Sequence, residues 1–312
     1  MTTQGVMVSI LVPVYNAAPY LRECVGSLTG QTCTDLQIVL INDGSTDDSW
    51  TILKELAHTD SRLEIYSQRN CGVAATRQHL LDKARGEFVL FVDSDDWIEP
   101  ETVEVLLQEQ GRGNYDMVMF QSSVSTGHQE TLTQDQAVKR FLEHRSFRGT
   151  LWNKLMRTCM LENVRVDQTV SYGEDAMMVW QVLQQLASVS IIDKALYHYR
   201  DNEESLSRQR FNGKKFTSYT TWDMICRDVD ESWPQYSDIA HARFACEMTQ
   251  VLRAAVLSGS KRDNSIRLLQ EEVRRDGAKI SRTGISSRKM GLYAWLVSRH
   301  YWLAKQLSPY LR

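Results

Sequence analysis

The stretch Phe88–Asp96, FVLFVDSDD, joins five consecutive apolar residues to an acidic cluster. A short apolar run that ends at a polar break is typical of a buried strand. Two comparable runs precede it, Val8–Val12 (VSILV) and Leu36–Ile41 (LQIVLI), with helical spacing between them. Strands and helices that alternate through short connections indicate a mostly parallel sheet covered by helices on both faces. The sequence therefore predicts an α/β fold for the first part of the chain.

The rest of the chain continues this pattern and then changes it. Further strands are predicted at Leu63–Tyr66 and Met117–Phe120, and helices over Tyr20–Leu28, from Asp47 to near His58 and over Gly72–Ala84. The polar segment Thr126–Gln136 is predicted as a loop. Beyond Asn202 the spacing becomes helical, with helices predicted at Ile239–Leu257 and Ile266–Arg275 and with Gly259 and Gly277 near their ends.

Composition excludes several classes of protein. The net charge of −3, from 36 basic and 39 acidic residues, gives no reason to expect nucleic-acid binding. The six cysteines form no C-x-x-C pair, which argues against a zinc site or a redox dithiol, and free thiols in a reducing compartment are expected. Apolar runs are too short for a transmembrane helix, and the phosphate-loop and dinucleotide-binding glycine motifs are absent. A cytoplasmic protein is expected.

Polar side chains follow three of the predicted strands. Tyr15 and Asn16 follow the first strand, Asp43 the second, and Asp93 and Asp95 the strand that ends at residue 92. Ligands of parallel sheets bind beyond the carboxyl ends of the strands. Two acids at positions i and i+2 can hold one Mg²⁺ or Mn²⁺ that also bridges substrate phosphates. The alternative is a solvated turn that caps the next helix.

Four other residues are open to two interpretations each. Asp43 is either a hydrogen-bond acceptor for a nucleobase or part of an Asp-Gly turn. Arg77 either reaches a phosphate or is a solvated helix arginine. Asp175 is either a general base or a helix cap. Trp152, in Trp152-Asn153-Lys154, is either a platform for a sugar or a core side chain beside a surface lysine.

Taken together and in order, these pieces resemble the family 2 glycosyltransferases, which have the GT-A fold. The resemblance is specific over the first 100 residues and looser to about Ser207. It rests on Pro13-Val14-Tyr15-Asn16, Asn42-Asp43-Gly44-Ser45-Thr46-Asp47, Asn70-Cys71-Gly72 through Arg77, Asp93-Ser94-Asp95-Asp96 and Gly173-Glu174-Asp175, and more loosely on Trp152-Asn153-Lys154-Leu155 and Tyr197-His198-Tyr199-Arg200.

The resemblance implies a role for each of these residues. Asp175 is expected to be the catalytic base, and Asp95, helped by Asp93, to hold Mn²⁺ or Mg²⁺. A contact with the acceptor or a phosphate is expected from Trp152, Lys154 and Glu174. The donor site is expected to comprise Pro13, Tyr15, Asn16, Asp43, Arg77, Asp93, Ser94 and Asp95.

The implied activity is an inverting, metal-dependent transfer of a hexose from a nucleotide-diphosphate sugar, with uridine favoured as the nucleoside. The acceptor would be a hydroxyl of a glycan or of a lipid-linked molecule in bacterial surface-polysaccharide or lipopolysaccharide synthesis. Two alternatives remain, a sugar-phosphate nucleotidyltransferase and a non-catalytic scaffold that binds nucleotide sugars. Asn16-Ala17-Ala18-Pro19 lacks the glycine-rich basic loop of the first, and the retained acids disfavour the second.

The resemblance also sets the expected organisation. A catalytic domain would cover residues 1–205, with a donor-binding half at 1–125 and an acceptor-binding half at 126–205. A helical C-terminal region with a basic aromatic tail would cover residues 206–312.

The tail from Ser286 to Arg312 is predicted to attach the enzyme peripherally to the inner face of the bacterial inner membrane. Residues 281–312 contain six Lys or Arg and no acid. On one helical wheel, Tyr293, Leu296, Val297, Tyr301, Ala304 and Leu307 share a face, and Trp295, Arg299 and Trp302 lie opposite. Tryptophan favours membrane interfaces, and basic residues such as Arg288, Lys289, Lys305 and Arg312 favour anionic lipid. A second copy of the chain is the alternative partner.

Overall fold

The computed structural model describes residues 6–121, 129–144, 147–200, 211 and 213–307. The chain forms two compact units. The sheet unit comprises Met1–Ala137, Gly149–Gln168 and Met178–Asn202, and the helical unit comprises Val138–Arg148, Thr169–Met177 and Glu203–Arg312. The predicted boundary between residues 205 and 206 lies outside the described residues, and the helical unit also takes two segments from before it.

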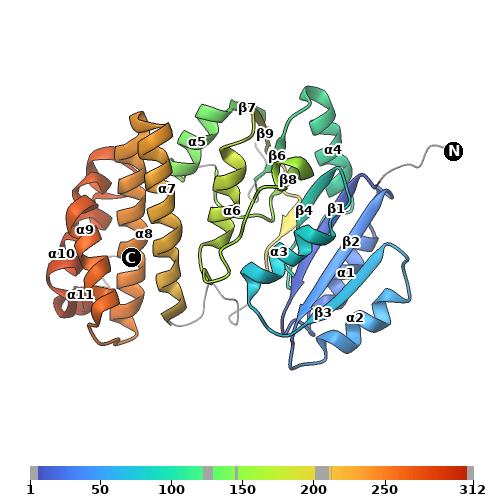
Figure 1. Ribbon diagram of the computed structural model, residues 1–312, viewed down its shortest axis with the longest axis horizontal. Coiled ribbons are helices and arrows are strands. Elements are labelled where there is room, and N and C mark those ends of the chain that lie inside the picture. The colour runs from blue at the N-terminus through green and yellow to red at the C-terminus, as the bar shows by residue number, and fades with distance from the viewer. Residues whose placement is uncertain (1–5, 122–128, 145–146, 201–210, 212, 308–312) are drawn as a thin grey trace. The chain divides into compact units, whose positions relative to one another are not determined.

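The sheet unit is built on one mixed sheet, for which the described residues supply eight strands in the order β3-β2-β1-β4-β8-β6-β9-β7 (Figure 1). Strands β3, β2, β1 and β4 are parallel to one another, and β6 is parallel to β9. Strand β8 is antiparallel to its neighbours β4 and β6, and β7 is antiparallel to β9. The strands are β1 (Val8–Val14), β2 (Leu36–Asp43), β3 (Leu63–Gln68), β4 (Phe88–Phe91), β6 (Met117–Phe120), β7 (Gln129–Thr133), β8 (Lys154–Arg157) and β9 (Ser188–Ile192). A small antiparallel pair joins β5 (Trp97–Ile98) to β10 (Tyr197–His198).

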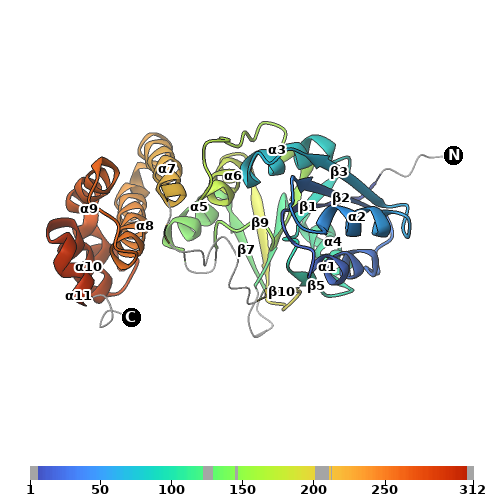
Figure 2. The same ribbon diagram turned by 90° about the horizontal axis from the view of Figure 1, so that it is seen from below.

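Helices lie on both faces of the parallel strands, as Figure 2 shows for α3 on one side and α1 and α2 on the other. The reason lies in the strands, which are apolar on both faces: every residue of β2 is buried, and all but Pro13 of β1. The helices of this part of the chain are α1 (Leu21–Thr29), α2 (Ser49–Ala57), α3 (Val73–Lys83), α4 (Thr102–Gly113), α5 (Gln134–Glu143) and α6 (Glu174–Leu183).

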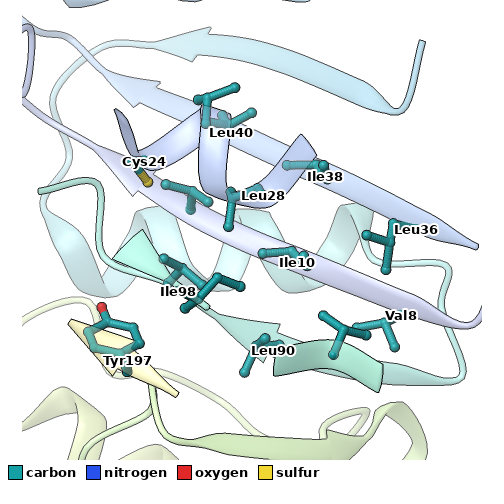
Figure 3. Packing of buried hydrophobic residues seen from close by; sticks show 14 of the residues in the cluster. Val8, Ile10, Cys24, Leu28, Leu36, Ile38, Leu40, Leu90, Ile98 and Tyr197 are labelled. Atoms are coloured by element: carbon teal, nitrogen blue, oxygen red, sulfur yellow. The ribbon is translucent and has the colours of Figure 1, made fainter. Parts of the chain in front are cut away.

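The core of the sheet unit forms where α1 packs on β1. Ile10 and Leu28 are fully buried there, and Figure 3 shows them in one cluster with side chains from β2 and β4. Removing a side chain of this size from such a core typically costs about 2–5 kcal/mol. The predicted α/β fold is thus confirmed in this unit, and its core fixes the strand ends that carry the polar residues.

The prediction of a loop at Thr126–Gln136 was wrong where the structure describes it. Gln129–Thr133 is strand β7, which pairs antiparallel with β9, and α5 begins at Gln134. An edge strand has one neighbour and can remain largely polar. Only Leu132 is buried in β7, so the sequence lacks the apolar alternation by which a strand is recognised.

The helical unit consists mainly of five helices among the described residues: α7 (Ser218–Ser232), α8 (Ser237–Leu257), α9 (Asn264–Thr283), α10 (Arg288–Arg299) and α11 (Tyr301–Leu307). Gly277, predicted near a helix end, lies inside α9, which runs on to Thr283. A Cβ at position 277 would stand 3.6 Å from the Cβ of Ala294 in α10. That distance is ordinary van der Waals contact, so the helix tolerates residue 277 in its interior and ends instead at Gly284, with φ +69°.

The C-terminal segment is two helices, which corrects the single helical wheel. His300 has φ −126° and ψ 67°, so the helix is interrupted and the spacing from Trp295 to Trp302 no longer describes one face. The buried set is confirmed for Tyr293, Leu296, Val297, Tyr301 and Ala304, and the side chain of Leu307 lies outside the described residues. Trp295 and Trp302 are 50% and 54% exposed. In the described part of the chain, no helix has the length and apolar character needed to cross a membrane.

Candidate active site

The predicted polar residues come together at one edge of the sheet. Strands β2, β1 and β4 are neighbours and run parallel, with Val14 paired to Asn42 and Leu11 to Phe91. Their carboxyl ends therefore meet, and they bring Asn16, Asp43 and Asp93 to the same edge. The sequence-based expectation of this convergence is confirmed, while the chemical role of each residue stays a prediction.

The loop after β1 is fastened to the loop after β2. Asn16 has φ 49°, a backbone conformation in which asparagine is enriched. Its N–H donates to Ser45 Oγ (3.0 Å), and its side-chain oxygen accepts from the N–H of Thr46 (2.8 Å). Tyr15 beside it is 52% exposed, which leaves its ring accessible for stacking. Asn16 thus shapes the loop that presents Tyr15, a role that the sequence did not distinguish from ligand contact.

Asp43 anchors the loop that follows β3. Its carboxylate, which is 4% exposed, accepts from the N–H groups of Cys71 and Gly72 and from Gln68 Nε2, each at 2.9 Å. The neighbouring Gly44 has φ +67°, and a Cβ there would stand 2.6 Å from the backbone nitrogen of Asn70. A carboxylate offers about four lone-pair sites. The Cys71 thiol also donates to Oδ1 (3.3 Å), so four donors already occupy the carboxylate and a nucleobase N–H would have to replace one of them.

Arg77 reaches the acidic turn from α3. Its side chain is almost fully buried, and Nη2 lies 3.7 Å from Oδ1 of Asp93. Gln68, which donates to Asp43, also donates to Thr76 Oγ1 (3.0 Å), and its Oε1 accepts from His79 Nδ1 (2.6 Å). These bonds tie α3 to the loops at the sheet edge and hold Arg77 in place. Gln68 was not identified from the sequence, because a lone glutamine at a strand end carries no distinctive signal.

The turn Asp93–Asp96 separates its acids into two kinds. Asp93, Ser94 and Asp95 are partly exposed, whereas Asp96 is 2% exposed. The Asp96 carboxylate accepts from the hydroxyl of Tyr197 and the N–H of Arg200, both at 2.7 Å. Burial raises the pKa of Asp96 to about 7. The two hydrogen bonds oppose this shift, and the negative charges of Asp93 and Asp95 add to it. Asp96 is thus a structural acid, and Asp93 and Asp95 are the acids that face outward.

The buried side chain of Cys24 packs against this turn. Its thiol is 1% exposed and lies 3.7 Å from the carbonyl oxygen of Asp93, to which it donates. Burial raises the pKa of Cys24 far above its usual value, and the negative charges of Asp96, Asp93 and Asp95 raise it further. The raised pKa favours the protonated thiol.

The donor set at the turn suits a hard divalent cation. Mg²⁺ and similar ions are commonly held by one or two carboxylates and complete their coordination with water and substrate phosphates. Asp93 and Asp95 supply two carboxylates, and the described residues contain no cluster of three or more His, Cys, Asp or Glu that would form an all-protein cage. The residues present fit a metal that is completed by a nucleotide diphosphate.

Trp152 and Lys154 lie in the sheet unit but have structural partners. The ring of Trp152 stacks on Tyr197, with centroids 4.4 Å apart. Lys154 is fully buried, and its Nζ donates to the Thr150 carbonyl (2.6 Å) and to Asn153 Oδ1 (2.8 Å). The ammonium group thus stabilises the Thr150–Asn153 turn. Contact of Trp152 with an acceptor, and of Lys154 with a phosphate, remain predictions.

The predicted base lies in the helical unit. Glu174 is 8% exposed and Asp175 is partly buried, both in the first turn of α6. Before them, Gly173 has φ +97°, a conformation that favours glycine. The hydroxyl of Thr217 accepts from the N–H groups of Ser171 and Tyr172, both at 3.0 Å. Thr217 was not identified from the sequence, since a threonine before a helix has many possible roles.

The family described as Glycosyl transferase family 2 matches residues 9–167. A relative, the putative glycosyltransferase EpsH of Bacillus subtilis, is 36% identical over 226 residues, which are 68% of this chain and 65% of EpsH. The chain therefore spans less than two thirds of that relative's length.

Solved structures show the same fold. Residues 1–349 of Staphylococcus aureus TarS in complex with UDP-GlcNAc match with a TM-score of 0.73 and 19% identity, over 97% of this chain and 92% of that one. The mannosyltransferase PcManGT of Pyrobaculum calidifontis, in complex with GDP-Man and Mn²⁺, matches with a TM-score of 0.57 and 16% identity, over 98% and 87%. At these identities the likeness concerns the fold alone, and it agrees with the predicted GT-A architecture.

Proposed function

Since the chain belongs to glycosyl transferase family 2, we propose that it transfers a hexose from a UDP-sugar to a hydroxyl of a glycan or lipid-linked acceptor, with inversion at the anomeric carbon. The observation that carries this proposal is the convergence of Asn16, Asp43, Asp93 and Asp95 at the ends of three adjacent parallel strands. Such an edge is where parallel sheets bind ligands. The matched region, residues 9–167, contains all four residues.

The donor half of the proposed site follows from the loops at this edge. Tyr15 presents an exposed ring on which a nucleobase stacks, and Asp43 adds a hydrogen-bond acceptor beside it. Pro13, in β1, and Ser94, in the acidic turn, complete the proposed pocket. The UDP-GlcNAc complex of TarS supports a uridine donor, because TarS matches this chain with a higher TM-score, 0.73, than PcManGT with GDP-Man, 0.57.

The diphosphate would lie over Asp93, Asp95 and Arg77. A divalent cation held by the two carboxylates would neutralise the departing diphosphate as the sugar leaves. Arg77 adds a guanidinium next to Asp93, where it offsets the carboxylate charge and can pair with a phosphate oxygen. PcManGT, which has the same fold, was captured with Mn²⁺, which supports this choice of cofactor.

The acceptor hydroxyl needs a base for direct, in-line attack on the anomeric carbon. We assign this role to Asp175, whose carboxylate would take the hydroxyl proton as the new bond forms. Asp175 lies in the first turn of α6, directly after the turn at Gly173. Glu174, at the start of the same helix, is assigned to acceptor contact.

The test is turnover of a panel of UDP- and GDP-sugars by the purified protein, with Mn²⁺ or with excess chelator. Hydrolysis or transfer of a UDP-sugar that needs the metal is expected, and NMR of a transfer product should show the inverted anomer. Asp95→Ala should abolish turnover and leave thermal unfolding unchanged. The matched control is Asp35→Ala, an exposed acid before β2 at the opposite edge of the sheet.

Four outcomes would contradict the proposal. Full activity in excess chelator would contradict the metal dependence. A product with retained anomeric configuration would contradict direct attack by the acceptor. Release of pyrophosphate from a sugar phosphate and a nucleoside triphosphate would instead identify a nucleotidyltransferase. Nucleotide-sugar binding without any turnover would favour the scaffold.

We further propose that α10 and α11 attach the protein to the inner face of the bacterial membrane, where a lipid-linked acceptor of surface-polysaccharide or lipopolysaccharide synthesis would be found. Leu292, Trp295, Trp302 and Leu303 are 47–61% exposed, and Arg299 lies over the ring of Trp295 at 5.5 Å. Residues 281–312 carry six basic side chains and no acid. Each basic residue near an anionic leaflet contributes roughly 1 kcal/mol, so the charge favours lipid over a second copy of this region.

Vesicle sedimentation separates these partners. The full-length protein should pellet with anionic liposomes and be released by high salt. Trp295→Ala with Trp302→Ala should weaken that binding, and Leu257→Ala, which removes an equally exposed apolar side chain from α8, should not. Unchanged vesicle binding in the double variant would contradict attachment through these helices. A mass in light scattering that falls from dimer to monomer in the double variant would show a homo-oligomer contact.

A further inference from the structure

The segment Leu196–Arg200 lies along the acidic turn, although about a hundred residues separate them in the chain. Strand β10 pairs antiparallel with β5, so that Tyr197 opposes Ile98 and His198 opposes Trp97. The rings of His198 and Trp97 stack with centroids 4.9 Å apart. Figure 3 shows Tyr197 near Ile98 in the core cluster. The turn is therefore bounded by β4 before it and by this later segment beside it.

The hydroxyl of Tyr197 bonds to both ends of the turn. It accepts from the N–H of Asp93 (3.1 Å) and donates to Oδ2 of Asp96 (2.7 Å). Tyr197 is 4% exposed, and one face of its ring is covered by Trp152. A buried hydroxyl with both a donor and an acceptor partner fixes the separation of those two groups more firmly than an exposed one.

Arg200 bonds to the remaining part of the turn. Its N–H donates to Oδ1 of Asp96 (2.7 Å), and its Nε donates to the carbonyl oxygen of Asp95 (2.9 Å). The guanidinium is held between the rings of Trp97 and Tyr20, 4.7 and 5.2 Å from their centroids. Its outer nitrogen pairs with Glu23 in α1. The side chain is thus fixed on several sides, and it places positive charge under a turn that carries three carboxylates.

We propose that Tyr197 and Arg200 are positioning residues that hold the Asp93–Asp96 turn in the conformation in which Asp93 and Asp95 bind a divalent cation. Asp96 is the anchor through which they act, because both of its carboxylate oxygens are bonded to them. The inference rests on the proposed function, since it concerns the metal of the same site. Neither residue touches the cation in this arrangement.

The physical reason is the cost of bringing carboxylates together. Acids in one short turn repel one another, and without fixed partners the turn would relax to separate them. A cation would then have to draw them back, and its affinity would fall. Partners in the outer shell of a metal site typically change metal affinity about 10–100-fold when they are removed.

The experiment measures Mn²⁺ binding directly, from the EPR signal of the free ion, with the full-length protein and UDP present. Tyr197→Phe removes one oxygen atom and both turn bonds. It should weaken Mn²⁺ binding about 10–100-fold and leave metal-free UDP binding unchanged. Tyr115→Phe is the matched control, since its hydroxyl bonds to Thr131 Oγ1 (3.1 Å) away from the turn. It should bind Mn²⁺ as the natural protein does.

Each outcome decides the matter. If the natural protein binds no Mn²⁺ in the presence of UDP, the proposed metal use is wrong and this inference fails with it. If the natural protein binds Mn²⁺ and Tyr197→Phe binds it equally well, the inference alone is overturned. An equal loss of metal-free UDP binding would also overturn it, because that would show general damage to the site.

A second variant covers the case in which Tyr197→Phe does not fold. Arg200→Lys keeps the positive charge and the backbone N–H to Asp96, but it loses the Nε bond to Asp95 and the planar group between the two rings. It should weaken Mn²⁺ binding at least several-fold. Unchanged affinity in this variant would overturn the role of Arg200.

Discussion

The turns Asp93–Asp96 and Ser171–Asp175 carry the two halves of the proposed chemistry, and they are held in different ways. The first lies in the sheet unit, and side chains from Tyr197 and Arg200 bind its acids and its backbone. The second belongs to the helical unit, where hydroxyl groups bind its backbone: Thr217 accepts from two of its N–H groups. The first turn is thus held through a buried acid as well as through its main chain, whereas the bonds from Thr217 hold the second through its main chain.

The difference follows from what each turn has to do. Several carboxylates in four residues repel one another, so the metal turn needs an acid that is satisfied elsewhere and cations nearby. The base turn must instead place one carboxylate, and a backbone with φ +97° at Gly173 sets its direction. Damage to the first turn should therefore appear in metal affinity. Damage to the second should appear in kcat, with donor binding preserved.

The largest expected effect tests this division at Asp175. Asp175→Asn keeps the shape of the side chain but removes its basicity, and loss of a positioned base typically costs about 10²–10⁴-fold in rate. Steady-state kinetics should show that loss in kcat, and calorimetry should show UDP affinity close to that of the natural protein. Asp223→Asn, an acid of α7 that pairs with Arg227 on the surface, is the matched control. Weakened UDP binding with normal kcat would move Asp175 to the donor site.

The strands and acids around the Asp93–Asp96 turn could largely be predicted from the sequence, whereas the surroundings of the Ser171–Asp175 turn could not. Apolar runs that end in acids identify β1, β2 and β4, and therefore the edge that carries Asp43 and Asp93. The motifs also single out Asp175. The strand β7 was missed, because a polar edge strand has no apolar alternation.

The supports of the two turns were harder to predict. Asp96, Tyr197 and Arg200 appear within recognised motifs, yet nothing in the spacing shows that they bond to one another across a hundred residues. Thr217 has no local signal, since its partners at Ser171 and Tyr172 are set by the packing of the helical unit. Hydrogen bonds between residues far apart in the chain depend on the tertiary fold, so they cannot be predicted from local sequence patterns.

The next effect concerns the backbone of the base turn. Gly173→Ala would place a side chain at φ +97°, which costs about 1–3 kcal/mol, and its Cβ would stand 3.3 Å from Thr221 Oγ1. Because a shift of the turn would move Asp175, kcat should fall roughly tenfold, which corresponds to about 1.4 kcal/mol. Steady-state kinetics measures the fall in kcat, and calorimetry checks that UDP affinity at the donor site is preserved.

Gly284→Ala is the matched control for backbone strain. Gly284 also has a positive φ, +69°, at the end of α9, and no atom lies within 4 Å of the added Cβ. It should lower thermal stability without lowering kcat. An equal fall of kcat in both variants would show that stability, and not the position of the base, sets the rate.

A smaller effect is expected at Thr217. Thr217→Val preserves shape but removes the acceptor for the partly buried N–H groups of Ser171 and Tyr172. A fully buried donor without a partner costs about 1–3 kcal/mol, and these groups should cost less. Water can partly replace the hydroxyl, so kcat should fall only about three- to tenfold. Thr283→Val, whose hydroxyl donates within α9 to the Lys279 carbonyl (2.8 Å), is the control and should retain full kcat. Loss of Mn²⁺ affinity in Thr217→Val would contradict the separation of the two turns.

The smallest expected effect is a pH-dependent loss of stability in the helical unit, and it tests whether the two turns belong to separate folding units. His241 in α8 lies 3.2 Å from Asp276 in α9 and 3.1 Å from Asp230 in α7. The hydrogen bond to Asp276 raises the pKa of His241 above its usual value of 6.5; burial opposes this shift, and Asp230 adds to it. Burial alone would raise the pKa of Asp276, but hydrogen bonds from His241, Arg275 and Lys279 outweigh it and hold that pKa well below the usual range.

The sign of the pH effect follows from the raised pKa of His241. The protonated imidazole stabilises the folded state fully below pH 6.5, and this contribution is lost as pH rises through the higher folded pKa. Hydrogen exchange between pH 6 and 9, corrected for the intrinsic rate, should therefore show falling protection of the amides in α7, α8 and α9. Amides in β1, β2 and β4 should keep theirs, because His241 lies outside the sheet unit. His241→Gln should flatten the profile of the helices, and a parallel loss of protection in the strands would show that both turns rest on one cooperative unit.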